Sequence, residues 1–309
     1  MTLRLFLLSL CVSLGLFQTT QADEARKHPD AAFLWKVEGK DLKQASYLFG
    51  TVHVSAPAVI NLHPAAQAAF ESADRVYTEV PMDMASQLKM APMLIRTDGK
   101  TLAGSLGPKN TKRLDAQLAA VNPALNHQAL NTMKTWFVAL TLPILEEQMQ
   151  GKQPLDVQLW NRAEKAGKQT GAIETFKTQL GKMDQLTEAE QVELSVSMIG
   201  AMEEAAEKGT DPLADLLEAY LKGDAKQLEK ALDATMEGKG AISPELEKKF
   251  TKLLIHDRNL EMSASIQKQL TAHPDEVLFF AAGTAHYIGD TSIVTLLQKA
   301  GYTVTRIQK

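Results

Sequence analysis

The chain has 309 residues, of which 45% are hydrophobic, and a formal net charge of −4. This length and composition are ample for one large folded domain or two ordinary ones, and they argue against a disordered or fibrous protein. The mild acidity and the lack of long basic runs argue against nucleic-acid binding.

The first 22 residues have the layout of a secretory signal peptide. Arg4 precedes an apolar run over residues 5–17, and the segment ends on the small residue Ala22. The run is shorter than the roughly 20 residues that a membrane-spanning helix needs. We therefore expect cleavage after Ala22 rather than a retained anchor, and a periplasmic or secreted mature chain, residues 23–309, with no membrane insertion. The sole cysteine, Cys11, would leave with the signal peptide, so a metal site in the mature chain must use His, Asp and Glu.

The mature chain is predicted to begin with strands. Residues 31–54 alternate apolar and polar side chains and break once in the middle, which predicts a hairpin or two short strands, the second ending at Gly50. A helix is expected from Pro64, because proline suits the first helical turn. Residues 74–80 predict a further strand, which we expect to lie beside residues 47–50.

Residues from about 85 to 270 predict a long helical insertion, because apolar side chains recur three and four positions apart. Thr187 and Glu190 predict a capping box at one helix start. Other helix starts are expected at Asp211-Pro212, Asp224 and Ser243-Pro244. One segment, residues 168–176, contains a glycine and a short apolar step and is more typical of a strand at a sheet edge.

The C-terminal residues repeat the order of the N-terminal ones. Residues 276–307 predict strand, turn, helix and strand, and residues 46–80 have the same order. Strands joined by helices form a sheet covered by helices, and ligands collect beyond the carboxyl ends of the strands. The predicted fold class is therefore α/β, with a central β-sheet formed from two matching halves and a long helical insertion in the middle.

Each half carries the pattern Gly-Thr-any residue-His directly after an apolar run. The residues of the two patterns are Gly50, Thr51 and His53, and Gly283, Thr284 and His286. With 18 glycines and 7 histidines in the chain, one Gly-x-x-His match is expected by chance about 0.4 times, so the repeated threonine and context carry the signal. We expect both imidazoles to face one crevice, whereas the alternative is that each caps a strand. The remaining histidines are expected to be structural or solvated: His28, His63, His127, His256 and His273.

Two carboxylates follow predicted strands. Glu79 ends the strand at 74–80, and Glu174 ends the short apolar step. A metal held by two imidazoles normally takes a carboxylate as its third ligand, and an acidic group at the end of an apolar strand is costly unless it is paired or metal-bound. Arg258 and Asn259 lie between apolar residues, where a guanidinium could orient a carboxylate or stabilise an oxyanion. An ordinary surface ion pair is the alternative for Arg258.

These blocks resemble the TraB/GumN family, which includes the TraB/PrgY pheromone-shutdown proteins and the animal Tiki proteases. The resemblance covers residues 33–307 and rests on YLFGTVHV, VYTEV, GAIETFKTQL, RNLEM and FFAAGTAHYIGDTSIVTLLQKAGYTV. It implies a fold related to erythromycin-esterase and haem-binding ChaN-like proteins. For the Tiki branch it implies a peptidase that depends on a divalent metal, manganese or cobalt. The functional positions it implies are Gly50, His53, Glu79, Glu174, Arg258, Asn259, Gly283 and His286.

The leading hypothesis is an exported metal-dependent hydrolase that acts as a peptidase on a peptide or protein substrate. His53, His286 and one glutamate, Glu79 or Glu174, would hold the metal; the other glutamate would be the general base, and Arg258 would stabilise the oxyanion. A second hypothesis is a non-catalytic protein that binds a peptide, haem or a polysaccharide fragment. A third is metal-free hydrolysis with a histidine as general base.

Overall fold

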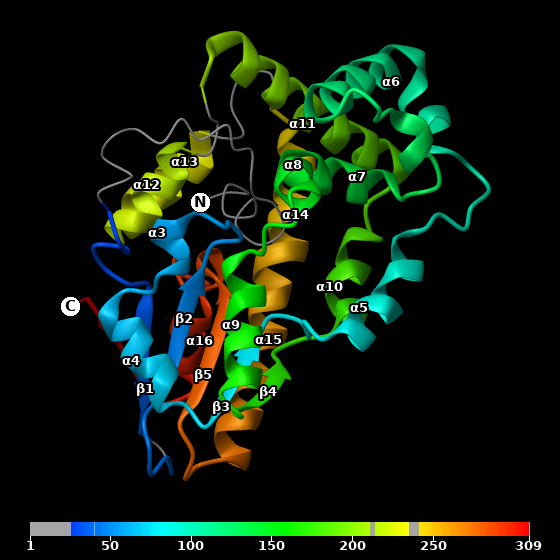
Figure 1. Ribbon diagram of the computed structural model, residues 1–309. Helices are drawn as coiled ribbons and strands as arrows, with labels where there is room; N and C mark the ends of the chain where they lie inside the picture. The colour runs from blue at the N-terminus through cyan, green and yellow to red at the C-terminus, as the bar shows by residue number, and fades with distance from the viewer. Residues whose placement is uncertain (1–25, 40, 211–213, 235–240, 309) are drawn as a thin grey trace.

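The computed structural model describes residues 26–39, 41–210, 214–234 and 241–308 (Figure 1). At its centre is a six-stranded sheet with the strand order β4-β3-β5-β2-β1-β6. The strands are β1 (Leu34–Glu38), β2 (Ser46–Thr51), β3 (Arg75–Thr78), β4 (Gln169–Ala172), β5 (Leu278–Gly283) and β6 (Thr303–Ile307). The predicted signal peptide and the helix start at Asp211-Pro212 lie outside the described residues.

Four neighbouring strands, β4, β3, β5 and β2, run parallel, whereas β1 is antiparallel to both β2 and β6. Strand β5 takes the central place, and all six of its residues are buried, as expected of a continuous apolar run in a parallel sheet. The prediction that residues 74–80 lie beside residues 47–50 is wrong, because β5 pairs with β2 on one side and with β3 on the other. The fold is α/β with a central sheet, as predicted.

The two predicted halves are not equivalent in the sheet. Strand β6, which closes the second half, pairs with β1 at the far edge, whereas β3, which closes the first half, lies on the other side of β5. The two motif-bearing strands are nevertheless adjacent, with Gly50 opposite Ala282 and Thr51 opposite Gly283. Both motifs therefore begin at the carboxyl ends of two adjacent parallel strands. A relationship to erythromycin-esterase and ChaN-like folds stays a prediction.

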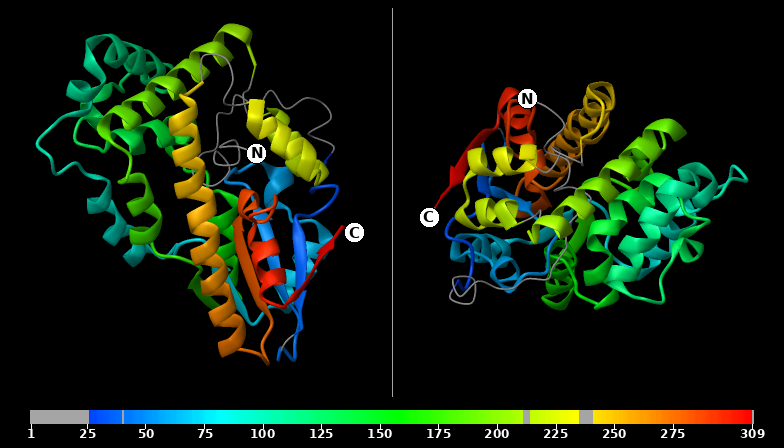
Figure 2. Two further views of the ribbon diagram at one scale, coloured as in Figure 1. Left: turned by 180° about the vertical axis from the view of Figure 1, so that it is seen from behind. Right: turned by 90° about the horizontal axis from the view of Figure 1, so that it is seen from above.

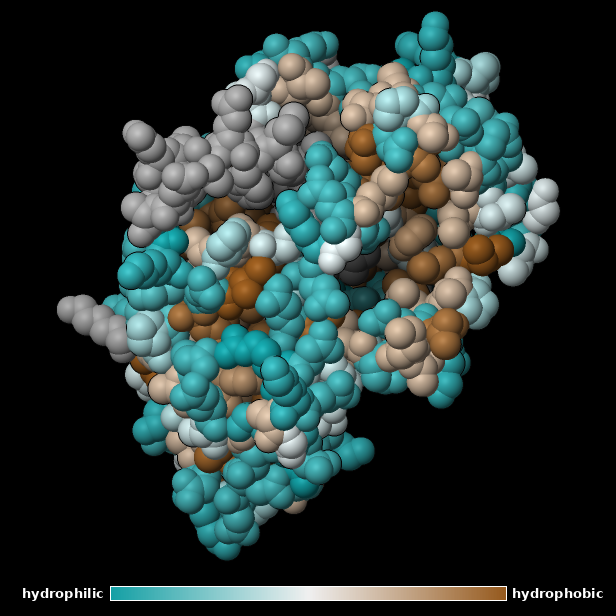
Figure 3. All heavy atoms as spheres, viewed as in Figure 1, coloured by the Kyte–Doolittle hydropathy of each residue, from teal (hydrophilic) through white to brown (hydrophobic). Residues whose placement is uncertain are grey.

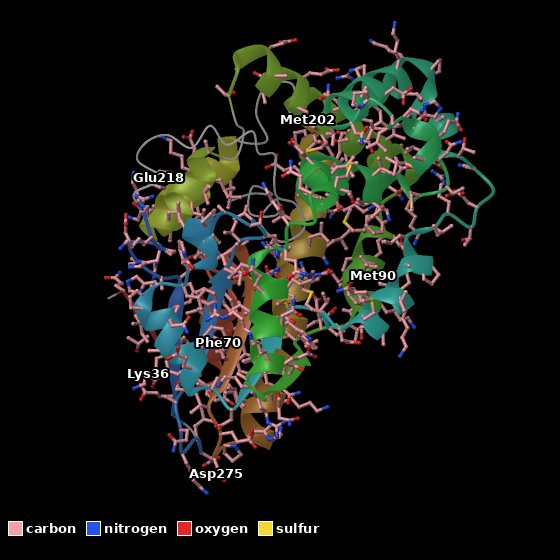
Figure 4. All side chains as sticks on the ribbon, viewed as in Figure 1. Lys36, Phe70, Met90, Met202, Glu218 and Asp275 are labelled. Carbon is pink, nitrogen blue, oxygen red and sulfur yellow. The ribbon has the colours of Figure 1, made fainter. Side chains whose placement is uncertain are left out.

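Helices cover both faces of the sheet (Figures 1 and 2). One face carries α3 (Pro57–Ile60), α4 (Pro64–Ser72) and α9 (Leu155–Lys165), and the opposite face carries α15 (Asp257–Ala272) and α16 (Ile293–Lys299). Pro64 is the first residue of α4, as predicted, and the His63 side chain accepts a hydrogen bond from the Ala65 amide. In the main core Phe70 of α4 meets Phe279 of β5 edge-on (Figure 4).

A second group of helices stands beside the sheet, with α6 (Leu102–Val121), α7 (Thr135–Thr141) and α11 (Glu188–Lys208) at its centre (Figure 2). Its apolar core includes Leu106, Leu114, Val138 and Met202, and Met202 is labelled in Figure 4. The helical elements outside the two layers are α5 (Met84–Met90), η2 (Ala91–Leu94), α6 (Leu102–Val121), η3 (His127–Leu130), α7 (Thr135–Thr141), η4 (Leu142–Ile144), α8 (Leu145–Met149), α10 (Phe176–Met183), α11 (Glu188–Lys208), α12 (Ala214–Lys222), α13 (Ala225–Ala234), α14 (Pro244–Thr251), η6 (Lys252–His256) and η7 (Thr284–His286). Within the described ranges, no helix is both long and apolar enough to cross a membrane.

Several local predictions in the helical part are confirmed. Thr187 and Glu190 form a capping box at the start of α11, and the Ser243 side chain caps α14. Asp224 accepts hydrogen bonds from two backbone amides at the start of α13. The segment 168–176, which was predicted to be a strand at a sheet edge, contains β4, the edge strand beside β3.

Candidate functional site

The first motif follows β2, and an aspartate from α9 holds it in place. His53 Nδ1 lies 2.7 Å from Oδ2 of Asp156, and the Thr51 hydroxyl donates to Oδ1 of the same carboxylate at 2.7 Å. Because a carboxylate oxygen only accepts, His53 Nδ1 is the donor and Nε2 is the nitrogen turned toward the crevice. The His53 side chain is 19% exposed, whereas that of Asp156 is buried.

The second motif follows β5, and an asparagine from α15 holds it. Oδ1 of Asn259 lies 2.6 Å from Nδ1 of His286, and the Asn259 amide donates to the Thr291 carbonyl at 2.9 Å. That second bond fixes which end of the amide faces the imidazole, so His286 also donates through Nδ1. A π-helical turn, η6, directly precedes α15, a departure from α-helical geometry that is frequent at functional sites.

The two motifs are joined directly. The Thr284 hydroxyl donates to the Thr51 carbonyl at 2.8 Å, so the two threonines of the repeat make different bonds. Gly50 allows this approach, because a Cβ there would lie 2.7 Å from Oγ1 of Thr284 and 2.9 Å from Cβ of Phe33. On its other side, the Gly50 carbonyl accepts a hydrogen bond from the Tyr220 hydroxyl of α12 at 3.0 Å.

Glu79 lies between the two histidines, just beyond the end of β3. Its Oε1 atom is 4.0 Å from Nε2 of His53 and 3.9 Å from Nε2 of His286. The same oxygen accepts a hydrogen bond from the Gly283 amide at 2.6 Å. One carboxylate oxygen therefore faces both imidazoles, and it receives its backbone bond from the glycine of the second motif.

Arg258 links Glu79 to Glu174 beneath the histidines. Its guanidinium donates to Oε2 of Glu79 at 2.5 Å, and to Oε1 of Glu174 through Nε at 3.0 Å and through Nη2. The Gln179 amide of α10 bonds both carboxylates, at 3.2 and 3.3 Å. All four side chains are buried, and Oε2 of Glu174 has no hydrogen-bond partner among the described residues.

Burial and neighbouring charges shift the two carboxyl groups in opposite directions. Burial raises the pKa of Glu79, but the positive charge of Arg258, followed by the electrostatic effects of the two imidazoles and the hydrogen bond from the Gly283 amide, outweighs it and lowers that pKa to about 2. Burial also raises the pKa of Glu174, and there the guanidinium of Arg258 does not fully offset it. Glu79 is therefore a permanent anion, whereas Glu174 is the carboxyl group that holds a proton more readily.

The two histidines are also shifted in opposite directions. Burial, followed by the positive charge of Arg258, lowers the pKa of His286 to about 3. Burial lowers the pKa of His53 as well, but the charge and hydrogen bond of Asp156 and the charge of Glu79 outweigh it and raise that pKa to about 9. The His286 ring is therefore neutral across the physiological range. The surroundings of His53 instead favour a positive charge, so they stabilise a proton or another cation at its Nε2 atom.

The donor types match those of a divalent metal site. Both imidazoles turn Nε2 toward Glu79 and are held through Nδ1, which is the usual arrangement behind metal-ligating histidines. His53 Nε2 is a buried atom that no described residue hydrogen-bonds. As the side chains stand, no group of three or more His, Cys, Asp or Glu in the described part of the chain could hold a metal ion. The residues nevertheless fit a divalent metal in donor type and orientation, with Oε1 of Glu79 at 4.0 and 3.9 Å from the two Nε2 atoms.

The structure brings together every residue singled out from the two motifs and the carboxylate blocks. Sequence reasoning missed Asp156 and Gln179, which touch the site from α9 and α10. Asp156 stands in the first turn of its helix, where an acidic residue ordinarily needs no further explanation. The other described histidines lie elsewhere, and His127, for example, bonds Asp115 at 2.9 Å.

Known proteins resemble this chain over most of its length. The sequence model of a family described as TraB/PrgY/gumN matches residues 33–306. The chain is 25% identical to metalloprotease TIKI2 of Danio rerio over 327 aligned residues, covering 93% of this chain and 63% of the relative. It is 24% identical to metalloprotease TIKI1 of Homo sapiens over 315 aligned residues, with 88% and 61% covered. The chain thus spans about three fifths of the length of these relatives. No solved structure matches the chain.

Proposed function

The chain belongs to the TraB/PrgY/gumN family, and from this premise we propose that it is an exported metal-dependent hydrolase that cleaves peptide bonds. The relatives named as metalloproteases, which share about one quarter of their aligned residues with this chain, support a metal-dependent protease. The observation that carries the proposal is the placement of Oε1 of Glu79 at 3.9 and 4.0 Å from two Nε2 atoms whose rings are anchored from behind.

His53, His286 and Glu79 would hold the metal, for which manganese and cobalt are the proposed identities. Glu79 is preferred to Glu174 as the third ligand because only Glu79 faces both imidazoles. A divalent ion bound there would polarise a scissile carbonyl and make a bound water more acidic.

Glu174 is the proposed proton carrier of the site. Arg258 joins it to Glu79, burial raises its pKa, and its Oε2 atom makes no hydrogen bond within the described residues. Arg258 bonds both carboxylates, which supports a role in holding them apart and in register. That role replaces the oxyanion role inferred from sequence, because the guanidinium is already directed at Glu79 and Glu174.

The helix beyond Glu79 supports a polypeptide as the substrate. Helix α5 begins five residues after Glu79 and has no buried residue. It exposes Met84 and Leu88, with 75% and 68% of their surface accessible, and these residues share one helical face because they are four positions apart. In Figure 3 hydrophobic side chains gather on this side of the molecule, over the helices beside the sheet. Methionine adapts to varied apolar partners, which suits peptides of differing sequence.

Export rests on the sequence of residues 1–22 and is likewise a proposal. A periplasmic or secreted location suits a site that uses only His and carboxylate donors, because such a site is indifferent to an oxidising environment. Mass spectrometry of the protein from a periplasmic fraction would show an N-terminus at Asp23 if the proposal holds.

The central experiment measures metal binding and peptide cleavage together. The mature chain is titrated with Mn²⁺ and with Co²⁺ by calorimetry, then incubated with a peptide library, with and without chelator, and products are identified by mass spectrometry. His53→Ala and His286→Ala should each abolish binding and cleavage. His273→Ala is the matched control, because His273 precedes β5 whereas His286 follows it, so the two histidines lie at opposite ends of that strand.

The outcomes separate the alternatives. Cleavage that the chelator stops and the two site variants lack supports the proposed peptidase. Tight retention of peptides with no products would instead indicate a binding protein. Cleavage that chelator leaves unchanged would point to metal-free hydrolysis with His53 or His286 as base, and the metal proposal would fall.

A further inference from the structure

Asp156 is a buried residue that belongs to neither motif and makes two short hydrogen bonds to the first motif. Asp156 uses one oxygen for the Thr51 hydroxyl and the other for Nδ1 of His53, each at 2.7 Å. Only 1% of its surface is exposed, so these two bonds form away from water. A carboxylate of this kind, bonded on both oxygens, has little freedom to turn.

A backbone hydrogen bond also joins the loop after β2 to α9. The amide of Leu155, the first residue of α9, donates to the carbonyl of Val54 at 3.2 Å. Three contacts thus join the end of β2 and the loop after it to the start of α9: Thr51 with Asp156, His53 with Asp156, and Val54 with Leu155. The loop that carries His53 is therefore fixed to a helix that packs on β3 and β4, the strands that precede Glu79 and Glu174.

The direction of each bond settles what His53 presents to the crevice. Asp156 accepts from Nδ1, so Nε2 is left toward Glu79, and Thr51 stops the carboxylate from rotating away. His286 gains the same orientation from the Asn259 amide. Each imidazole thus has its own anchor, one carboxylate and one amide.

We propose that Asp156 is a positioning residue for metal binding, which sets the ring orientation of His53 and keeps Nε2 available, with Thr51 as its second anchor. The inference rests on the proposed metal-dependent function and deepens it. Partners behind a metal-ligating histidine typically change metal affinity by about 10- to 100-fold when removed, so a loss of that size is expected for Asp156→Ala.

The experiment measures the dissociation constant for Mn²⁺ by calorimetry and the visible spectrum of bound Co²⁺, which reports the ligand arrangement. Asp156→Ala should weaken Mn²⁺ binding by about 10- to 100-fold and alter the Co²⁺ spectrum. Asp156→Asn keeps one acceptor for Nδ1 and should lose less affinity, as should Thr51→Val, which leaves the His53 bond intact. These two variants test the inference even if Asp156→Ala does not fold.

Asp115→Asn is the matched control. Asp115 also accepts from a histidine Nδ1, that of His127, at 2.9 Å, but in the helical part of the molecule, so its Mn²⁺ affinity and Co²⁺ spectrum should equal those of the wild type. If the wild type binds Mn²⁺ and the three site variants bind it equally well with an unchanged Co²⁺ spectrum, the inference is overturned and the proposed function stands. If the wild type binds neither metal, both are overturned.

Discussion

The same four-residue pattern spans the end of β2 and the loop after it, and the end of β5 and the turn after it, yet the two histidines are held differently. His53 is partly exposed and is anchored by a carboxylate from α9, whereas His286 is fully buried and is anchored by an amide from α15. The pKa of His53 is raised to about 9 and that of His286 is lowered to about 3. The repeated pattern therefore specifies the place of each imidazole, whereas the charge is set by the Asp156 anchor at His53 and by burial and the charge of Arg258 at His286.

Burial explains why the anchors differ. The centre of the site already contains the carboxylates of Glu79 and Glu174 around one guanidinium, Arg258. A second anionic anchor beside His286 would add an uncompensated buried charge, which is costly. An asparagine orients the ring through the same kind of bond without that cost, whereas the buried carboxylate of Asp156 faces His53, whose raised pKa favours a compensating positive charge.

Removing Arg258 should disturb both halves at once, because both face Glu79. Arg258→Met would leave two carboxylates buried without their cation, and losing one partner of a buried ion pair costs about 3–5 kcal/mol. The expected loss in the free energy of unfolding, from urea denaturation, is of that size. Lys182→Met removes a cation from the ion pair with Glu261, whose side chain is half-exposed, and should cost less than about 1 kcal/mol. Equal losses in the two variants would contradict the buried network.

Gly50→Ala should break the direct contact between the halves. The new Cβ would meet Thr284 and Phe33 at less than 3 Å, and overpacking of this kind costs about 1–3 kcal/mol. Gly181→Ala is the control, because Gly181 lies inside α10 with nothing within 4 Å of the added Cβ. It should raise stability by about 0.5–1 kcal/mol. Thermal unfolding of the two variants should shift in opposite directions, and a stabilised Gly50→Ala protein would show that the motifs are not in close contact.

Changing the amide of Asn259 to a carboxylate, and the carboxylate of Asp156 to an amide, tests whether charge is what distinguishes the two anchors. Asn259→Asp loses the bond to the Thr291 carbonyl and sets a carboxylate oxygen against it, so we expect a loss of about 1–3 kcal/mol in the free energy of unfolding. Asp156→Asn should cost less, because the amide can still accept from His53 and can donate to the Thr51 hydroxyl. Urea denaturation of both variants measures the difference, and an equal or larger loss in Asp156→Asn would show that charge is not what separates the anchors.

Several helices and strands could be predicted from sequence because each is encoded locally. The apolar run of β5, the proline at the start of α4 and the capping box of α11 depend on neighbouring residues. Strand order could not be predicted in the same way, because the crossover helices decide that β5 rather than β2 lies next to β3.

The same distinction holds for the site. Glu79 and both histidines follow mostly buried strands, and Glu174 follows the edge strand β4; these positions after strands mark them in the sequence. Asp156 lies about one hundred residues from His53, in a helical turn where aspartate is common. No local pattern links it to the motif, and only the packing of α9 against the loop after β2 reveals the contact.

The smallest effect is expected from an ionic cluster away from both halves. Glu188 at the start of α11 bonds Arg96, Lys100 and Ser105, and these bonds lower its pKa to about 2. Because the pKa is lower in the folded state, the stabilisation is complete above the ordinary glutamate value and is lost as the pH falls from about 4.5 toward 2. Unlike the buried carboxylates around Arg258, this cluster is partly exposed, so it should contribute no more than about 1 kcal/mol and weaken with salt. Glu188→Gln should therefore lower stability slightly at pH 7 and not at pH 2, and a difference that persists at pH 2 would contradict the assignment.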